Sequence, residues 1–480
     1  CVGGFDSEPT TRGALRRTSR LRSCSCCYPG SVAGGVGGTA GVAGNVTVEM
    51  LDVTTLASVG DNVEINNLDN NTSGNGAQDV TISARDSSSL AVIDAALGFG
   101  TYAGIAGAVD VAIIRNTTAA SIGDGSDVRA KGDITVAGLQ NVQTDSIVVS
   151  AAGAAVGIAA GVSVTSIGDG LDPDGEGSKK LEDDDGNSIG DFVQDGVKDQ
   201  TVNNELLATS ENSNVQSIGT SMQAKRDALD VSGQLTTSAP PLDIPAGTSA
   251  SIGSANIDAG GKLAVESHQT VETKFVAGAI AAGGVGLGAG VGVTVIDTTN
   301  TAQIIGDNAD LVKAGNVLVR AGTSHVMDGK GLVAAVGGIA GAAALNVFTD
   351  TSNTYATISG VDGQVSGLVN VDAESETELT ALAGAVGAGG SVAAAAGVAV
   401  GVITKTTTAQ ITGTADIEAG DVIVEADSVE DIGTLVAGAA AGGAAGGAGT
   451  VAVMSITTDT TAKIGAAARV VAQGNAAVLS

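Results

Sequence analysis

One unit of about 53 residues recurs through the second half of the chain, and this repeat limits the possible folds more than any other feature. Each copy carries an isoleucine at the same place, and consecutive isoleucines lie 52 to 54 residues apart. These anchor residues are Ile252, Ile304, Ile358, Ile411 and Ile464. Such regular spacing indicates stacked copies of one structural module, because a module of this size buries its apolar face only against its neighbours.

Each copy contains a short stretch in which apolar and polar residues alternate. In GDVIVEA, Val422 and Val424 point to one face while Ile423 and Glu425 point to the other, as expected for a strand with one buried side. The same place in the other copies holds Leu263 and Val265, Val317 and Val319, and Val369 and Val371. Divergent copies with Ile134 and Val136, and with Val80 and Ile82, suggest that the module begins near residue 31.

Long uncharged tracts separate these strands, and each is long enough to cross a bilayer as a helix. They cover Ser146–Gly168, Phe275–Ile296, Gly331–Thr349, Leu379–Thr404 and Ile432–Thr458. Between Val285 and Val295, large residues alternate strictly with Gly or Thr. A helix would scatter the large residues around its circumference, whereas a strand gathers them on one face and leaves the other nearly bare. Repeated Gly also costs a helix about 1 kcal/mol per residue relative to Ala, so the pattern favours strands.

Glycine-rich joints lie midway through the tracts, at 281–284, 336–338, 387–390 and 440–447. Glycine permits positive φ in a tight turn, so we expect each tract to form two strands with a reversal between them. Ala and Gly faces would let the layers approach closely. The sequence therefore predicts an all-β fold, a β-solenoid of stacked repeats of about 53 residues that resembles a parallel β-helix. Whether each repeat makes one wide coil or two ordinary coils stays open.

The composition agrees with thin layers and excludes several kinds of partner. The chain has 72 Gly, no Trp and only 2% aromatic residues, so it lacks the bulky side chains of a round core. Its net charge of −30 repels nucleic acid and anionic lipid. We therefore expect no nucleic-acid partner and no membrane insertion by this segment. A disordered chain would have fewer hydrophobic residues than the 43% found here.

Four regions follow from these patterns. Residues 1–30 form an irregular segment that contains several arginines and all four cysteines, in a spacing that fits no standard zinc site. Residues 31–167 hold divergent repeats, and residues 248–480 hold regular ones. Between them, residues 168–247 form an acidic insertion rich in Pro and Gly. Because insertions in repeat proteins form loops that often bind partners, we expect specific recognition there.

The acidic insertion also contains the one candidate metal site. Hard oxygen ligands in a flexible loop suit Ca²⁺, and the candidate ligands are Asp172, Asp174, Asp183 and Asp185. Their spacing does not match the twelve-residue calcium loop or the nonapeptide of calcium β-rolls. A solvated acidic loop is the alternative. No other cofactor is expected.

Nothing in the sequence indicates catalysis. The two histidines, His268 and His325, each follow an alternating strand and are interpreted as polar surface residues. No GxSxG elbow or comparable nucleophile motif occurs. Four aspartates that follow anchor positions, namely Asp61, Asp124, Asp169 and Asp307, are interpreted as turn residues. We therefore predict that the chain is not an enzyme.

Three stretches resemble the repeats of a known family. ADIEAGDVIVEA, ANIDAGGKLAVES and GSDVRAKGDITVA are similar to repeats in the passengers of filamentous-haemagglutinin-like adhesins and other large autotransporter or two-partner-secreted surface proteins of Gram-negative bacteria. The resemblance covers residues 31–167 and 248–480. It implies right-handed β-helix coils, an extracellular or cell-surface location and binding to proteins or glycans of host or neighbouring cells. The Ala/Gly-rich tracts and the 53-residue spacing depart from the family pattern.

The leading hypothesis is thus a structural stalk or binding segment of a large secreted or cell-surface bacterial adhesin. Two alternatives come from other classes of protein. One is a membrane-embedded assembly of Gly-zipper helices, formed by the uncharged tracts. The other is a β-helix enzyme that acts on polysaccharides through paired carboxylates.

Overall fold

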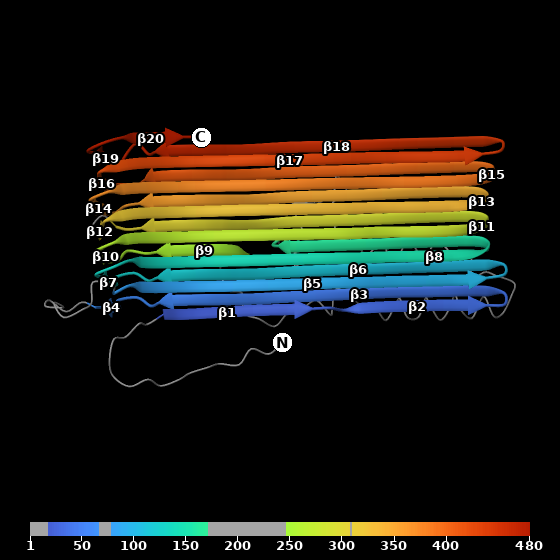
Figure 1. The fold of residues 1–480 in the computed structure, drawn as a ribbon, viewed down its shortest axis with the longest axis horizontal. Coiled ribbons are helices and arrows are strands. Elements are labelled where there is room, and N and C mark those ends of the chain that lie inside the picture. The colour runs from blue at the N-terminus through green and yellow to red at the C-terminus, as the bar shows by residue number, and fades with distance from the viewer. Residues whose placement is uncertain (1–17, 67–77, 171–245, 308–309) are drawn as a thin grey trace, which may run out of the picture.

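The computed structural model describes residues 18–66, 78–170, 246–307 and 310–480, and these residues form an all-β structure with no helix. Figure 1 shows long strands stacked one above another, with the chain advancing steadily from one end of the stack to the other. Every strand pairing within the described ranges is parallel.

The described residues form twenty strands. In the N-terminal part these are β1 (Thr18–Cys27), β2 (Gly30–Gly37), β3 (Ala40–Val59), β4 (Glu64–Ile65), β5 (Val80–Gly100), β6 (Ala103–Ile122), β7 (Asp127–Ala130) and β8 (Ile134–Gly168). In the C-terminal part they are β9 (Gly247–Ile252), β10 (Asn256–Ala259), β11 (Lys262–Ile305), β12 (Leu311–Ala314), β13 (Asn316–Ser359), β14 (Asp362–Val365), β15 (Leu368–Thr412), β16 (Asp416–Ala419), β17 (Asp421–Gly442), β18 (Ala445–Ile464), β19 (Arg469–Ala472) and β20 (Ala476–Leu479).

Each copy of the repeat has the same three parts, which are clearest in β11 and β12. The first limb runs from Lys262 to Gly283, and the return limb runs back from Val285 to Ile305. The reversal is visible at the right of Figure 1. A Cβ on Gly288 would lie beside Ala279, so the two limbs pack face to face. The short strand β12 then closes the copy and leads into the next one.

Successive copies pair residue by residue along their whole length. Leu263 lies opposite Val317, Val317 opposite Val369, and Val369 opposite Val422. One repeat of about 53 residues therefore makes one wide layer, which answers the question that the sequence left open. The short strands form a separate seven-stranded sheet in the order β19-β16-β14-β12-β10-β7-β4. Within the described ranges, seven copies of the repeat each end in one of these short strands. Their first limbs are β1/β2, β5, β8, β11, β13, β15 and β17.

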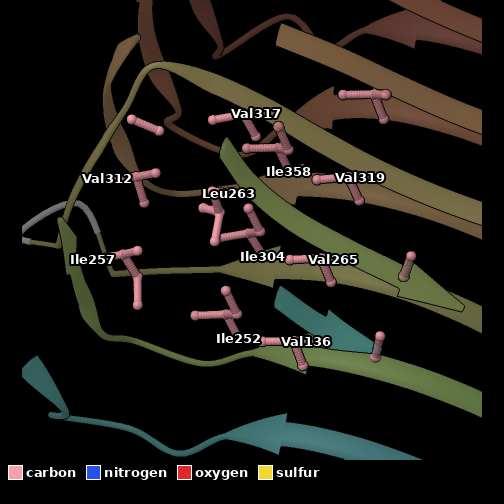
Figure 2. Packing of buried hydrophobic residues seen from close by; sticks show 14 of the residues in the cluster. Val136, Ile252, Ile257, Leu263, Val265, Ile304, Val312, Val317, Val319 and Ile358 are labelled. Atoms are coloured by element: carbon pink, nitrogen blue, oxygen red, sulfur yellow. The ribbon is translucent and has the colours of Figure 1, made fainter. Parts of the chain in front are cut away.

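The main apolar core lies where the limbs meet the short strands (Figure 2). The anchor residues Ile252, Ile304 and Ile358 point inward there, together with Ile257 and Val312 from the short strands. The alternating stretches behave as the sequence predicts: both valines of GDVIVEA are fully buried, and so are their counterparts in the other copies. Each copy contributes only a few branched side chains, and the core is continuous because the copies stack.

In the uncharged tracts, the bare face points inward and the large residues point outward. On the return limb of β11, Gly286, Gly288 and Gly290 are buried, whereas Val285 and Leu287 are partly exposed. The facing residues of the first limbs are mainly alanines, which form a second core cluster with Ala279, Ala281 and their counterparts. Small residues on both inner faces allow the two limbs to lie close together, as the sequence predicts.

The glycines at the reversals do not have the positive φ that the sequence analysis expects. Among the described glycines, positive φ occurs only at Gly125, Gly168, Gly247, Gly360 and Gly413. At the reversals, glycine is required by close approach instead. A Cβ on Gly389 would collide with the backbone oxygen of Val392, and one on Gly442 would collide with that of Ala445. The predicted reversals are confirmed, but glycine is needed in them because a side chain would collide with the backbone, and not because φ is positive.

Two further predictions concern residues 1–30 and the uncharged tracts. Residues 1–30 are predicted to be irregular, yet Thr18–Cys27 forms β1 and pairs in parallel with β5. The sequence analysis missed this strand because the segment is rich in Arg and Cys and has no apolar alternation, whereas in the fold it pairs with β5. The uncharged tracts are strands, and nowhere in the described ranges is a helix both long and apolar enough to cross a membrane.

Candidate functional site

The acidic insertion leaves the stack and returns to it at almost the same point. β8 ends at Gly168, opposite Asp297 of the next copy, and β9 begins at Gly247, opposite Thr299. The whole excursion therefore takes the place of one residue, the partner of Thr298. Both glycines have positive φ, 86° and 134°, which a residue with a side chain rarely adopts. These backbone bends let the chain leave without interrupting the ladder.

Side chains tie the two ends of the insertion together. A carboxylate oxygen of Asp169 accepts a hydrogen bond of 3.1 Å from the backbone N–H of Ala246. The other oxygen of Asp169 lies 2.9 Å from the guanidinium of Arg115, on the return limb of the preceding copy. The predicted turn residue Asp169 thus holds the exit point of the insertion in place.

The four candidate calcium ligands lie inside this insertion. Asp172, Asp174, Asp183 and Asp185 fall outside the described residues, so the calcium site stays a prediction. In the ranges that the structure does cover, no group of three or more His, Cys, Asp or Glu residues is arranged to hold a metal ion.

Aspartates in the loops join consecutive copies, which confirms their interpretation as turn residues. Asp61 accepts a 3.0 Å hydrogen bond from the backbone N–H of Asp124, and Asp124 accepts one of 2.9 Å from Ser254 in the following copy. The same kind of contact recurs at the start of four first limbs, with acceptors Asp79, Asp133, Asn316 and Asp421. The backbone N–H of Asp307 donates a 2.9 Å hydrogen bond to Asp310 Oδ2.

The two histidines differ in environment although their positions in the sequence repeat look alike. His268 is exposed on the outward face and lies 3.4 Å from the hydroxyl of Thr270. Partial burial and the nearby charge of Arg320 lower the pKa of His268. Its interpretation as a surface residue is confirmed.

The same interpretation is wrong for His325, which is fully buried between the limbs. Its Nδ1 lies 3.0 Å from Asp350 Oδ1, and its Nε2 lies 3.5 Å from the hydroxyl of Thr298. The hydroxyl of Thr377 donates a 2.9 Å hydrogen bond to the second oxygen of Asp350. Successive residues of a strand face opposite sides, and His325 occupies an inward position whereas His268 occupies an outward one. The repeat pattern did not reveal this, because most copies have Val, Ser or Thr at the position of His325.

This hydroxyl–imidazole–carboxylate chain has the order of a catalytic triad but no access to substrate. Thr298, His325 and Asp350 are each at most 2% exposed. A nucleophile needs an open space beside it where a reacting carbonyl can sit. The chain of contacts is therefore a satisfied polar network inside the core.

Charges from the next copies extend this network. The ammonium group of Lys405 is buried and lies 3.1 Å from Glu430 Oε1, which also accepts a hydrogen bond from Ser428. Burial by itself raises the pKa of Asp350, but the charge and hydrogen bond of His325 and the charge of Lys405 outweigh it and hold that pKa below its usual value. Buried charges of opposite sign thus compensate one another in copies four to seven.

Three carboxyl groups near the N-terminal end of the stack have no such compensation. Asp94 and Asp110 are completely buried, and Glu49 lies partly buried on the adjoining copy. Burial, followed by the nearby Asp110 and Asp94, raises the pKa of Glu49 to about 9, and burial raises that of Asp110 to about 6. Thr47 donates a 2.7 Å hydrogen bond to Asp94, and Ser146 one of 2.5 Å to Asp110. The sequence analysis missed this group, although an acid at an inward position next to an uncharged tract could have revealed it.

No family model, no curated protein and no solved structure matches this chain.

Proposed function

We propose that this chain is a structural segment of a large secreted or cell-surface bacterial adhesin, and that its stacked copies form a β-solenoid stalk. The observation that carries the proposal is the unbroken parallel ladder: all seven copies pair along both limbs, even across the exit of the insertion. In such a stack every backbone group of an inner strand has partners above and below, so the layers resist bending and sliding.

The length of such a stalk grows with the number of copies. Neighbouring strands lie about 4.8 Å apart, so seven layers would give a rod on the order of 30 Å long. Each added repeat would extend the rod without changing the core, because each copy contacts only its neighbours. A long array of these repeats would therefore hold a binding region away from a bacterial surface, which agrees with the adhesin resemblance.

The insertion is the proposed binding region. Its two ends lie beside β6, β8 and β9 and are held together by contacts among Asp169, Ala246 and Arg115. In this proposal, the residues between them can vary without disturbing the stack. Proteins or glycans on host or neighbouring cells are the proposed partners, and an extracellular location follows from that role. Calcium bound by Asp172, Asp174, Asp183 and Asp185 would order the loop.

No specific observation supports either alternative function. The Gly-zipper assembly needs helical tracts, and the tracts are strands. A polysaccharide enzyme needs paired carboxylates in a site that can hold a sugar. Asp94 and Asp110 are completely buried, and the exposed Glu374 and Asp427 lie on the outer surface, where Glu374 is paired with Arg320.

The proposal is tested by comparing the chain with a variant that lacks the insertion. Beads coated with the wild-type chain are offered to cultured epithelial cells and to bacteria, with and without about 2 mM EDTA to strip a weak calcium site. We expect adhesion by the wild type and its loss in the variant, while both keep strongly β circular dichroism without detergent. Equal adhesion by both chains, or a dominantly helical spectrum, would contradict the proposal.

A further inference from the structure

The outward surface of each first limb is apolar near the reversal. Among the described residues of this surface, Lys330 is the one charged residue, and it lies at the edge farthest from the reversal. Nine of the large apolar side chains are 41–62% exposed. They are Ile93, Leu97, Phe99, Ile147, Ile280, Leu332, Val336, Val386 and Leu435. We call the surface formed by these residues and the small residues between them the first-limb face. Exposed apolar patches beyond a few hundred Å² usually mark a site of interaction.

Large and small residues alternate from one copy to the next along two adjacent ladders of this face. One ladder runs Gly34, Leu97, Ala151, Ile280, Ala334, Val386 and Ala439. The neighbouring ladder runs Val32, Ala95, Val149, Gly278, Leu332, Gly384 and Ala437. Within these two ladders, each large residue stands beside small residues above, below and on the other ladder. The centre of the face is therefore a checkerboard of knobs and holes, whereas its outer ladders place large residues next to one another, such as Ile93 beside Ile147 and Val36 beside Phe99.

The outward face of the return limbs is different. Its ladders are uniform, as in the row Val46, Val109, Val162, Val291, Leu345, Val398 and Val451. Near the exit of the insertion, Val164, Val293 and Val295 form a cluster that is only 1–6% exposed. The return-limb face thus lacks two adjacent ladders in which large and small residues alternate, although side chains such as Val46, Leu287 and Val451 are exposed there as well.

We propose that the first-limb face binds the first-limb face of a second copy of this chain, so that two stalks lie side by side. A two-fold axis parallel to the stack and midway between the two ladders keeps each layer at its own height. It places Ile280 of one copy over Gly278 of the other, and Leu332 over Ala334. Matching of this kind gives interfaces the packing density of a protein core. A fluid lipid phase would gain nothing from holes at regular positions.

The size of the face is sufficient for a stable pair. Seven layers spaced by about 4.8 Å, each with about seven residues rising 3.3 Å, give on the order of 800 Å² per copy. Specific interfaces typically bury about that much on each partner. The charge distribution is also compatible, because a two-fold axis parallel to the stack points the two reversals in opposite directions. The charged halves of the two copies then lie on opposite sides of the contact, despite the net charge of −30 on each chain.

The first test introduces charge on one face or the other. Sedimentation of the full chain is compared with that of the double variant Ile280→Asp/Leu332→Asp and with the control Leu287→Asp, whose side chain is equally exposed on the return-limb face. We expect wild type and control to form dimers, and the double variant to dissociate with a dissociation constant raised at least about tenfold. Unchanged circular dichroism shows that each variant is folded. A monomeric wild type, or an equal effect of Leu287→Asp, would overturn the proposal.

The second test distinguishes a second copy from lipid. Ala334→Leu fills a hole while adding apolar area, so it weakens pairing of two copies by a clash but strengthens any insertion into lipid. We expect weaker dimers and no sedimentation with phosphatidylcholine vesicles. Stronger vesicle binding by Ala334→Leu would overturn the proposal in favour of a lipid partner. Cell adhesion by beads does not depend on pairing, so failure here leaves the adhesive role intact.

Discussion

The buried carboxyl groups near Glu49 have no compensating positive charge among the described residues, so we expect the stability of the fold to depend on pH. The pKa of Glu49 is about 9 in the fold, against 4.5 for an unperturbed glutamate. Because the folded pKa is raised, its contribution to stability is fully present below pH 4.5 and is lost as the pH rises toward 9. We expect Glu49→Gln to remove that loss, so that its melting temperature exceeds that of the wild type at pH 8 but not at pH 4. The difference at pH 8 should be on the order of 2–4 °C. Asp52→Asn, on the exposed side of the same strand, is the control and should show no such crossover.

The two histidines offer a second residue-scale prediction with an internal control. His325→Ala leaves the buried carboxylate of Asp350 without its partner, which typically costs about 3–5 kcal/mol. His268→Ala removes an exposed side chain and should change the free energy of unfolding by less than about 0.5 kcal/mol. Urea denaturation at pH 7 measures both. Similar values for the two variants would mean that the buried network does not stabilise the fold.

At the scale of the element, the inward glycines of the return limbs set the distance between the two layers. A Cβ on Gly286 would lie 2.6 Å from the backbone oxygen of Val336, whereas one on Gly44, which faces outward, would meet nothing within 4 Å. We expect Gly286→Val to destabilise the chain by about 1–3 kcal/mol or more, because the backbone must shift. Gly44→Val should be neutral or slightly stabilising, since valine favours strands. Thermal unfolding followed by circular dichroism distinguishes the two.

The same elements show where pattern analysis succeeded and where it could not. Alternation identified the strands and the buried valines at 422 and 424, because one face of those stretches is polar. In the stretch from Val285 to Val295 neither face is polar, so the pattern could not say which one is buried. A polar residue on one face would have shown which side of this strand meets solvent, and the stretch contains no charged residue. The inward position of Glu49 and His325 was missed for a related reason, because a charged residue is normally assigned to the surface.

At the scale of the whole molecule, the insertion is an addition to a stack that is complete without it. Because the excursion replaces the single partner of Thr298, we expect a chain in which one threonine replaces residues 169–246 to fold with the same β spectrum. Its melting temperature should lie within about 4 °C of the wild type, equivalent to about 1 kcal/mol. A large loss of stability would show that the inserted residues form part of the core.

The sequence by itself determined that the chain is built from strands, that the repeat has about 53 residues, and that the insertion lies between residues 168 and 247. These properties are local or periodic, so alternation, glycine and charge report them directly. Only the tertiary structure decided that one repeat makes one wide layer, that glycine faces inward and valine outward, and that acids and a histidine lie within the core. Those features depend on which surfaces meet when two uncharged layers fold together, and the chain pairs the faces that can approach most closely.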